Sequence, residues 1–232
     1  VKSPEGKVLA GPLNFTLPAG KRVVLVGQSG SGKSSLLNAL TGFLPYDGSL
    51  LVNGVELRDL DASRWHRLLS WVGQNPQLPA ATLRENVLLA WPEASEAQLQ
   101  LALDKAWVSE FISQLPQGIN TPVGDQAGRL SVGQAQRIAV ARALLVPCRL
   151  LLLDEPAASL DAHSEQRVMQ ALFNASSQQT TLMVTHQLEG IADWDAIWVM
   201  QDGQIVEQGT YSQLAMANGP FAALLAHRQE EI

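Results

Sequence analysis

Two hydrophobic patterns share the chain. Short apolar runs rich in β-branched residues predict buried strands in the first and last parts, whereas capped helices with loops are expected from Asn75 to about Leu145. The expected strands are residues 22–26, 70–73, 150–153, 180–184, 196–200 and 204–206. We therefore predict a single domain in which an α/β core, residues 1–75 and 146–232, is interrupted by a helical subdomain at 76–145.

Turn and capping residues add further elements. Asn53-Gly54 tolerates the positive φ angles of a type I′ turn, so residues 49–57 are expected to form a hairpin. The apolar runs at 8–9 and 13–17 are expected to be edge strands. The residues expected to cap helices are Thr82, Ser95 and Ser109, with helices to residues 90, 106 and 115. Other helices are expected at 36–40, 63–69, 136–145, 162–174 and 221–227.

Composition narrows the class of protein. Of 232 residues, 46% are hydrophobic, which is enough for a sizeable core, and the net charge of −6 argues against a nucleic-acid partner. No stretch approaches the ~20 apolar residues of a membrane-spanning helix. Because the chain begins at Val1 within an apparent strand and turn, we expect a soluble fragment of a longer protein. The single cysteine, Cys148, is expected to be a buried, inert thiol in a reducing compartment.

The chemistry begins in the loop after the first of these strands. This loop matches the phosphate-binding pattern G-x-x-x-x-G-K-[ST] at every fixed position and lies between a strand and a helix. Its residues are Gly27, Gln28, Ser29, Gly30, Ser31, Gly32, Lys33, Ser34 and Ser35. Lys33 would reach the β- and γ-phosphates, and Ser34 would ligate Mg²⁺. We therefore predict a nucleoside triphosphate site rather than a flexible Gly/Ser loop.

Two adjacent carboxylates follow another buried strand. Residues 150–153 are all leucine, and Asp154 and Glu155 end the run. The strand beside a phosphate-binding loop is expected to supply an acid to Mg²⁺, a role that suits Asp154. Glu155 would point elsewhere and polarise the attacking water. The alternative is a solvated strand end without a function, which leaves two acids at the end of a hydrocarbon strand with no cation.

A five-residue motif precedes this strand. The motif, Leu130-Ser131-Val132-Gly133-Gln134, begins a predicted amphipathic helix, and Ser131 with Gln134 would form a capping box, which alone explains both residues. It also resembles the L-S-G-G-Q signature of the ATP-binding cassette (ABC) ATPases, with Val132 in place of the first glycine. Three more segments resemble that family in the family's own order: Gln74 its Q-loop, residues 158–161 its D-loop ending in Asp161, and Thr185-His186 its switch histidine.

This resemblance implies a fold and a mechanism. The fold would be a RecA-like P-loop NTPase core with an antiparallel β subdomain and an inserted α-helical subdomain. ATP would be the substrate, and two ABC subunits would close head-to-tail on it. The residues expected at the site are Ser34, Gln74 and Asp154 for Mg²⁺, and Glu155 and His186 for catalysis. The signature residues that would bind the partner's ATP are Ser131, Val132, Gly133 and Gln134. Gly133 would let the γ-phosphate approach the backbone.

Further segments resemble the exporter branch of the family. Gln77–Asn86 and Thr121–Asp125 are similar to surfaces that receive the coupling helices of transmembrane domains. Residues 154–161, 185–188 and 226–231 resemble the heterodimeric exporters of glutathione and cysteine. The resemblance implies transmembrane domains on the same longer chain, a second and different ABC subunit, and a position at the cytoplasmic face of the bacterial inner membrane.

The aromatic residue that stacks on adenine in related exporters is missing, and a second function is compatible with the sequence. Ser3-Pro4 stands where exporters often show a Tyr that stacks on adenine, and Phe15 is expected to be a core residue. A soluble ABC ATPase without a membrane partner is the alternative function, which the acidic charge disfavours. A P-loop kinase would not explain residues 130–134 or His186.

Overall fold

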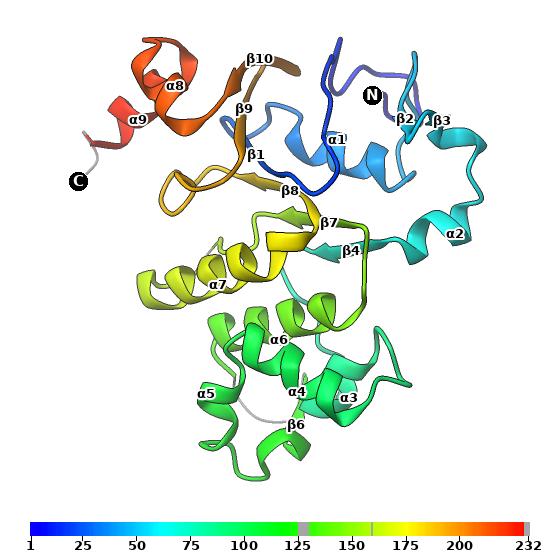
Figure 1. Cartoon of the computed structure of the whole chain (residues 1–232), viewed down its shortest axis with the longest axis vertical. Coiled ribbons are helices and arrows are strands. Elements are labelled where there is room, and N and C mark those ends of the chain that lie inside the picture. Colours follow the sequence, from blue (N-terminus) through cyan, green and yellow to red (C-terminus); the bar gives the residue numbers. More distant parts are fainter. Residues whose placement is uncertain (125–129, 159, 230–232) are drawn as a thin grey trace. The chain divides into compact units, whose positions relative to one another are not determined.

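A computed structural model describes residues 1–124, 130–158 and 160–229 (Figure 1). The chain divides into two compact units. We call them the sheet unit, residues 1–69, 149–154 and 179–232, and the helical unit, residues 70–148 and 155–178. The subdomain boundaries expected from the sequence stay a prediction. Three parts of the family resemblances lie outside the described residues: Asp125, Ser159 and Glu230-Glu231.

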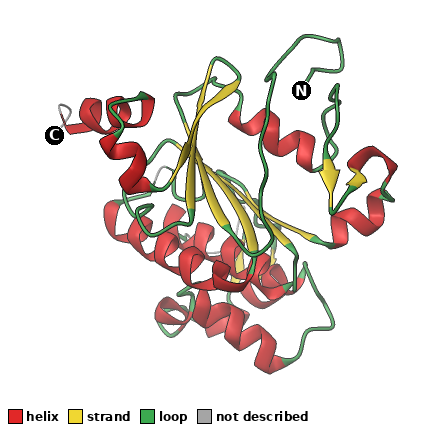
Figure 2. Ribbon diagram, turned by 45° about the horizontal axis from the view of Figure 1, so that its top comes forward, coloured by secondary structure: helices red, strands yellow, loops and turns green. Residues whose placement is uncertain are grey.

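Five strands of the sheet unit lie in the order β10-β9-β1-β8-β7. They are among the strands drawn in yellow in Figure 2. β9, β1, β8 and β7 run parallel to one another, and β10 runs antiparallel to β9. Strands of a parallel sheet are typically continuous apolar runs. In agreement, β1, β7, β8 and β9 are buried along nearly their whole length. Their bounds are β1 Arg22–Val26, β7 Leu150–Asp154, β8 Thr180–Thr185, β9 Ala196–Gln201 and β10 Gln204–Gly209.

The same unit contains a hairpin and short helices. Asn53 and Gly54 have φ of 49° and 82°, which confirms the predicted turn. Leu36, Leu37 and Leu40 of α1 pack into the core cluster with Leu152 and Trp198. The remaining elements are α1 Lys33–Leu40, β2 Leu51–Val52, β3 Val55–Glu56, η1 Leu57–Asp59, α2 Ala62–Arg67, α8 Tyr211–Met216 and α9 Pro220–Gln229.

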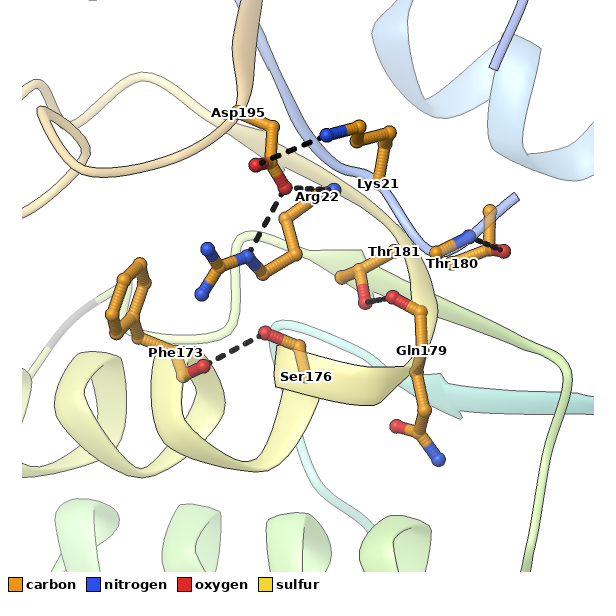
Figure 3. Close-up of polar contacts among 9 residues, drawn as sticks. Lys21, Arg22, Phe173, Ser176, Gln179, Thr180, Thr181 and Asp195 are labelled. Carbon is orange, nitrogen blue, oxygen red and sulfur yellow. Dashed lines mark hydrogen bonds and ion pairs between the residues drawn. The ribbon is translucent and has the colours of Figure 1, made fainter. Parts of the chain in front are cut away.

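Hydrogen bonds join the starts of three strands in this sheet (Figure 3). The Asp195 carboxylate accepts from the backbone N–H of Arg22 at 2.8 Å and from its Nε at 3.2 Å. Burial alone would raise the pKa of Asp195, but the hydrogen bonds from Arg22 and the positive charges of Arg22 and Lys21 together outweigh it and hold that pKa below its ordinary value. Thr180 Oγ1 accepts from the N–H of Gly20 at 2.9 Å. These bonds fix β1 against β8 and β9 at the end where the strands begin.

The expected edge strands near the N-terminus are wrong. Lys2 and Val8 form an isolated bridge, and residues 13–17 belong to no strand in the described part of the chain. Their side chains nevertheless alternate between half-buried and exposed, and Phe15 packs on Trp198 with ring centroids 5.3 Å apart. Pro12 and Pro18 bracket the segment and lack the N–H that a ladder needs. The run is apolar because it covers the core, as expected for Phe15.

The helical unit is built around one long helix. α6 packs against α3, α4 and α7. None of the described helices is long and apolar enough to cross a membrane. The chain passes from the sheet unit into this unit within β4, Leu69–Val72. The other elements are β5 Ala81–Thr82, α3 Leu83–Leu88, α4 Glu96–Lys105, α5 Ser109–Ile112, η2 Gly118–Asn120, β6 Pro122–Val123, α6 Val132–Leu145, α7 Ala162–Ala175 and η3 Ser176–Gln178.

Most predicted caps are confirmed. Thr82 and Ser95 each form a complete capping box at the start of α3 and α4. Ser109 is not a cap: Val108 holds that position, and Ser109 is the first residue of α5. Cys148 is a buried free thiol, as expected, and burial raises its pKa. The sequence reading missed α8, although Thr210 forms a capping box there too.

Candidate nucleotide-binding site

Strand register brings the chemical residues of the sheet unit to one edge. Val26 pairs with Thr185, and Asp154 pairs with Val184. The loop after β1, the end of β7 and His186 after β8 therefore share the carboxyl edge of the sheet, where ligands bind in open α/β sheets. One expectation is corrected here. β8 lies between β1 and β7, so the strand of Asp154 is not next to the strand that leads into the phosphate-binding loop.

Two glycines of the loop are required by its surroundings. A Cβ at Gly27 would overlap the carbonyl oxygen of Met200. Gly32 caps α1 in the left-handed conformation with φ of 99°, and a Cβ there would lie 2.9 Å from the Leu9 carbonyl oxygen. Larger residues cannot take these positions without moving the backbone. Packing within the chain therefore requires these two glycines, in addition to any requirement from a bound phosphate.

Lys33 lies inside the curl of the loop. Its side chain is only 6% exposed, and Nζ donates to the carbonyl oxygens of Gly27 and Gln28, both at 2.8 Å. Ser31 Oγ lies 3.5 Å from the same nitrogen. The ammonium is therefore held by the loop that opens α1, whose N-terminus favours an anion.

Ser34 and Asp154 meet although 120 residues separate them. The Ser34 hydroxyl donates to Asp154 Oδ1 at 3.2 Å. Although β8 separates β1 from β7 in the sheet, α1 packs against β7 and so brings Ser34 close to Asp154. Among the described residues, no group of three or more His, Cys, Asp or Glu could hold a metal ion. A hydroxyl and one carboxylate fit Mg²⁺ that takes its other ligands from phosphates and water.

Glu155 has an unusual backbone. Its φ is 48°, a left-handed conformation that a residue other than glycine adopts at a cost, and Pro156 follows it. Such strain is typical of residues placed for function. His186 is exposed directly after β8. Thr185 Oγ1 accepts from the N–H of Gln187 at 3.0 Å, which orders the turn that carries the histidine.

The signature segment of the helical unit is capped as predicted. Ser131 is the N-cap of α6, and its Oγ accepts from the N–H of Gln134 at 3.1 Å. Gln134 Oε1 accepts in return from the N–H of Ser131 at 3.0 Å. Val132 is the first helical residue and is 57% exposed, with an ordinary backbone. Gly133 is buried. The valine is therefore compatible with the helix start.

The Q-loop and D-loop residues also lie in the helical unit. Asp161 caps α7 by accepting from the N–H of Ser164 at 3.0 Å, and this hydrogen bond lowers the pKa of Asp161. Gln74 is exposed, directly after Gly73. The Gly73 carbonyl oxygen accepts from Gln136 Nε2 at 2.9 Å.

Gln136 and Arg142 were missed by the sequence reading. Gln136 fastens one end of the Gln74 segment, and Arg142 Nη1 donates to the Gln77 carbonyl oxygen at 3.1 Å at the other end. Arg142 also donates to Asn86. The sequence held no signal for them, because the burial of Gln136, which is 1% exposed, depends on how α6 packs in the helical unit.

Known proteins resemble this chain along its whole length. The family model described as ABC transporter matches residues 10–158, more than half of the chain. The chain is 78% identical over all 232 residues to the glutathione/L-cysteine transport system ATP-binding/permease protein CydD of Escherichia coli (strain K12), and covers 40% of that protein. It is 60% identical, again over its full length, to the transport ATP-binding protein AarD of Providencia stuartii, of which it also covers 40%.

A solved structure shares the fold. A bacterial Atm1-family ABC exporter with ATP bound superposes with a TM-score of 0.88 at 34% identity, over 95% of this chain and 39% of that one. The chain thus spans about two fifths of the length of the relatives it matches. The α/β fold expected from the sequence is confirmed by this match. The chain belongs to the ABC transporter family, as an ATP-binding ATPase domain of that family.

Proposed function

We propose that this chain binds and hydrolyses ATP with Mg²⁺ and so powers an exporter. The observation that carries the proposal is the 3.2 Å contact between Ser34 Oγ and Asp154 Oδ1. It joins the helix that follows the phosphate-binding loop to the acidic end of β7. Lys33, the neighbour of Ser34, is held inside that loop. A buried cation and a pair of hard oxygen ligands are what a nucleoside triphosphate with Mg²⁺ requires.

Each residue has a distinct part in the proposed reaction. Backbone N–H groups of residues 27–35 and the Lys33 ammonium bind the phosphates. Ser34 and Asp154, with Gln74 as a third proposed ligand, would hold Mg²⁺, which would supply positive charge against the phosphate oxygens. Glu155 accepts a proton from the attacking water, and His186 donates a hydrogen bond to the γ-phosphate.

A second ABC subunit completes the proposed site. Ser131 and Val132 are exposed at the start of α6, a helix of 14 residues whose N-terminus favours an anion. In a head-to-tail pair, the signature of each chain would bind the ATP held by the other. ATP would then hold the two chains together, and loss of the γ-phosphate would release them.

The relatives suggest the cargo and the setting. Relatives at 78% and 50% identity are named for glutathione/L-cysteine transport and as ATP-binding/permease proteins, and a structural neighbour is an exporter. We therefore propose glutathione or cysteine as cargo, transmembrane domains on the same longer protein, and a different ABC subunit as partner. The site would face the cytoplasm at the inner membrane.

Phosphate release from ATP tests the core of this proposal. Together with its partner subunit, the chain should hydrolyse ATP with Mg²⁺ and lose the activity in excess EDTA. Ser34→Ala and Asp154→Asn should each raise the Mg²⁺ concentration needed for half-maximal rate by roughly tenfold, about the energy of one charge-assisted contact. Matched exposed positions, Ser63→Ala and Asp59→Asn, serve as controls. An unchanged Mg²⁺ requirement in both site variants would contradict the proposed ligands.

The cargo needs a separate experiment with the longer protein and its partner in inside-out membrane vesicles. Labelled glutathione or cysteine should accumulate in the vesicles only with ATP. Glu155→Gln should abolish the uptake while leaving the vesicles able to bind ATP. Accumulation at the same rate with Glu155→Gln would contradict a coupling of this site to transport.

A further inference from the structure

Gly133 packs against the first turn of another helix. A Cβ built on Gly133 would lie 2.6 Å from Ser164 Oγ and 2.7 Å from Ser164 Cβ. Ordinary carbon contacts are about 3.5–4.0 Å, so no side chain fits there while Ser164 stays in place. Both residues belong to the helical unit, where α6 packs on α7. Packing against Ser164 of the same chain therefore requires glycine at this position, independently of any requirement from the partner's phosphate.

Ser164 also holds the residue that begins α7. Its backbone N–H donates to Asp161 Oδ1 at 3.0 Å, and its hydroxyl hydrogen-bonds the same side chain. Ser164 is only 8% exposed, so it has little room to turn away from Gly133. One small side chain thus contacts both the signature glycine and the D-loop carboxylate.

Among the described residues, no other atom crowds the space above Gly133 to the same degree. The next atom that a Cβ there would meet is Leu160 Cδ2 at 3.9 Å, an ordinary van der Waals distance. Removing the Ser164 side chain would therefore open the space for a methyl group. This makes the contact testable by a compensating substitution.

A second tie between the same helices lies farther along them. Glu110 of α5 accepts from Arg137 Nη1 of α6 at 3.0 Å and pairs with Arg167 Nη2 of α7 at 3.2 Å. The Arg137 side chain is 11% exposed, and its guanidinium also lies over the Phe111 ring. The two helices are thus joined both at their first turns and farther along.

We propose that Ser164 is a positioning residue that locks the signature to the D-loop. Through its contact with Gly133 and its hydrogen bonds to Asp161, it sets the spacing between the N-termini of α6 and α7. The two motifs then act as one rigid element. The catalytic consequence rests on the proposed function, because both motifs would serve the ATP held by a partner chain.

The experiment compares Gly133→Ala with two double variants. Gly133→Ala should lower the melting temperature of the chain by roughly 3–8 °C, the shift expected from overpacking in a domain of this size. Helix propensity alone predicts the opposite sign, because alanine is the better helix former. Adding Ser164→Gly should restore most of the loss, corrected for Ser164→Gly alone. Adding Ser164→Ala should not, because its Cβ remains 2.7 Å from the new methyl group.

ATP-driven pairing and hydrolysis are measured on the same variants. Gly133→Ala should cut the maximal hydrolysis rate roughly tenfold to a hundredfold, since displacement of a site by about 1 Å has effects of that size. ATP affinity of the single chain should stay unchanged. Ser164→Gly should restore the rate in the double variant. A merely structural contact would restore the melting temperature without restoring the maximal rate.

The outcomes separate this proposal from its rivals. If Gly133→Ala leaves the melting temperature unchanged and Ser164→Gly rescues nothing, the glycine serves only the partner's phosphate and the lock is wrong. If the unchanged chain, supplied with its partner subunit, neither pairs nor hydrolyses ATP, the proposed function fails. The melting data still decide in that case whether Ser164 and Gly133 are in contact.

Discussion

The two units place their chemical residues by different means. In the sheet unit, Lys33, Asp154 and His186 come from three segments, and the register of β1, β8 and β7 aligns their positions. In the helical unit, Ser131 and Asp161 are each fixed by a bond to a residue three positions along the chain. The residues of the sheet unit come together only when the whole sheet has formed. The helix starts of the helical unit depend only on residues a few positions apart in the sequence.

This difference assigns different tasks to the units. A site held by parallel strands is rigid and suits binding of the phosphates and of Mg²⁺. A helix start with exposed Ser131 and Val132 offers its N–H groups to a ligand brought by another molecule. Substitutions in the sheet unit should therefore act on the single chain, and those in the signature should act on pairing.

The largest effect is expected at Glu155. Glu155→Gln keeps the shape and the left-handed backbone but removes the base, so hydrolysis should slow at least ~100-fold with ATP binding intact. The ATP-bound pair should then accumulate. Phosphate release and sedimentation with ATP measure both effects, with the exposed Glu93→Gln as control. Turnover within a few-fold of the unchanged chain would remove Glu155 from the role of base.

Lys33→Ala tests the sheet unit by itself. Loss of a cation that hydrogen-bonds phosphate should weaken ATP binding by the single chain by about 10- to 150-fold, the range for hydrogen bonds to charged groups. Nucleotide titration of the unpaired chain is the measurement, and the exposed Lys105→Ala is its control. Unchanged affinity would place the phosphates away from Lys33.

Val132→Asp tests the helical unit in the same way. Asp at the first position of α6 suits the helix N-terminus, and Val132 is 57% exposed, so stability should hold. Opposite a partner's γ-phosphate at about 8 Å, the new charge should weaken ATP-driven pairing by about 30-fold, or ~2 kcal/mol at an effective dielectric constant near 20. Val132→Asn is the neutral control. Weaker ATP binding by the unpaired chain would show that both motifs share one pocket within a single chain, and the head-to-tail model would be wrong.

The same difference explains what the sequence could predict. The caps at Thr82, Ser95 and Ser131 are confirmed because a capping box is local and has its own residue pattern. The order of the strands was not predictable in this way. Asp154 was expected on the strand beside the loop, yet β8 lies between β7 and β1, the strand that leads into the loop, because strand order depends on contacts between distant segments.

The contact at Gly133 shows the same limit at the scale of one residue. From the sequence, Gly133 was predicted to be required because a partner's γ-phosphate approaches its backbone. The sequence could not indicate Ser164, because that contact depends on how α6 packs on α7. Likewise, residues 13–17 read as a strand because their apolar positions alternate, while pairing requires a neighbour that no local pattern specifies.

The smallest expected effect concerns recognition of the base of the nucleotide, to which none of the residues compared above is assigned. Ser3-Pro4 stands where an aromatic ring would stack on adenine, and Phe15 packs on Trp198 instead. Without the roughly 0.5–1.5 kcal/mol of a stacking ring, the phosphates should supply most of the binding energy. ATP and GTP should therefore bind the chain with similar affinity. Titration of both nucleotides measures the ratio, and Ser3→Tyr should shift it toward ATP by a few-fold if the ring can reach the base. A tenfold preference for ATP in the unchanged chain, about 1.4 kcal/mol, would show that another residue recognises adenine.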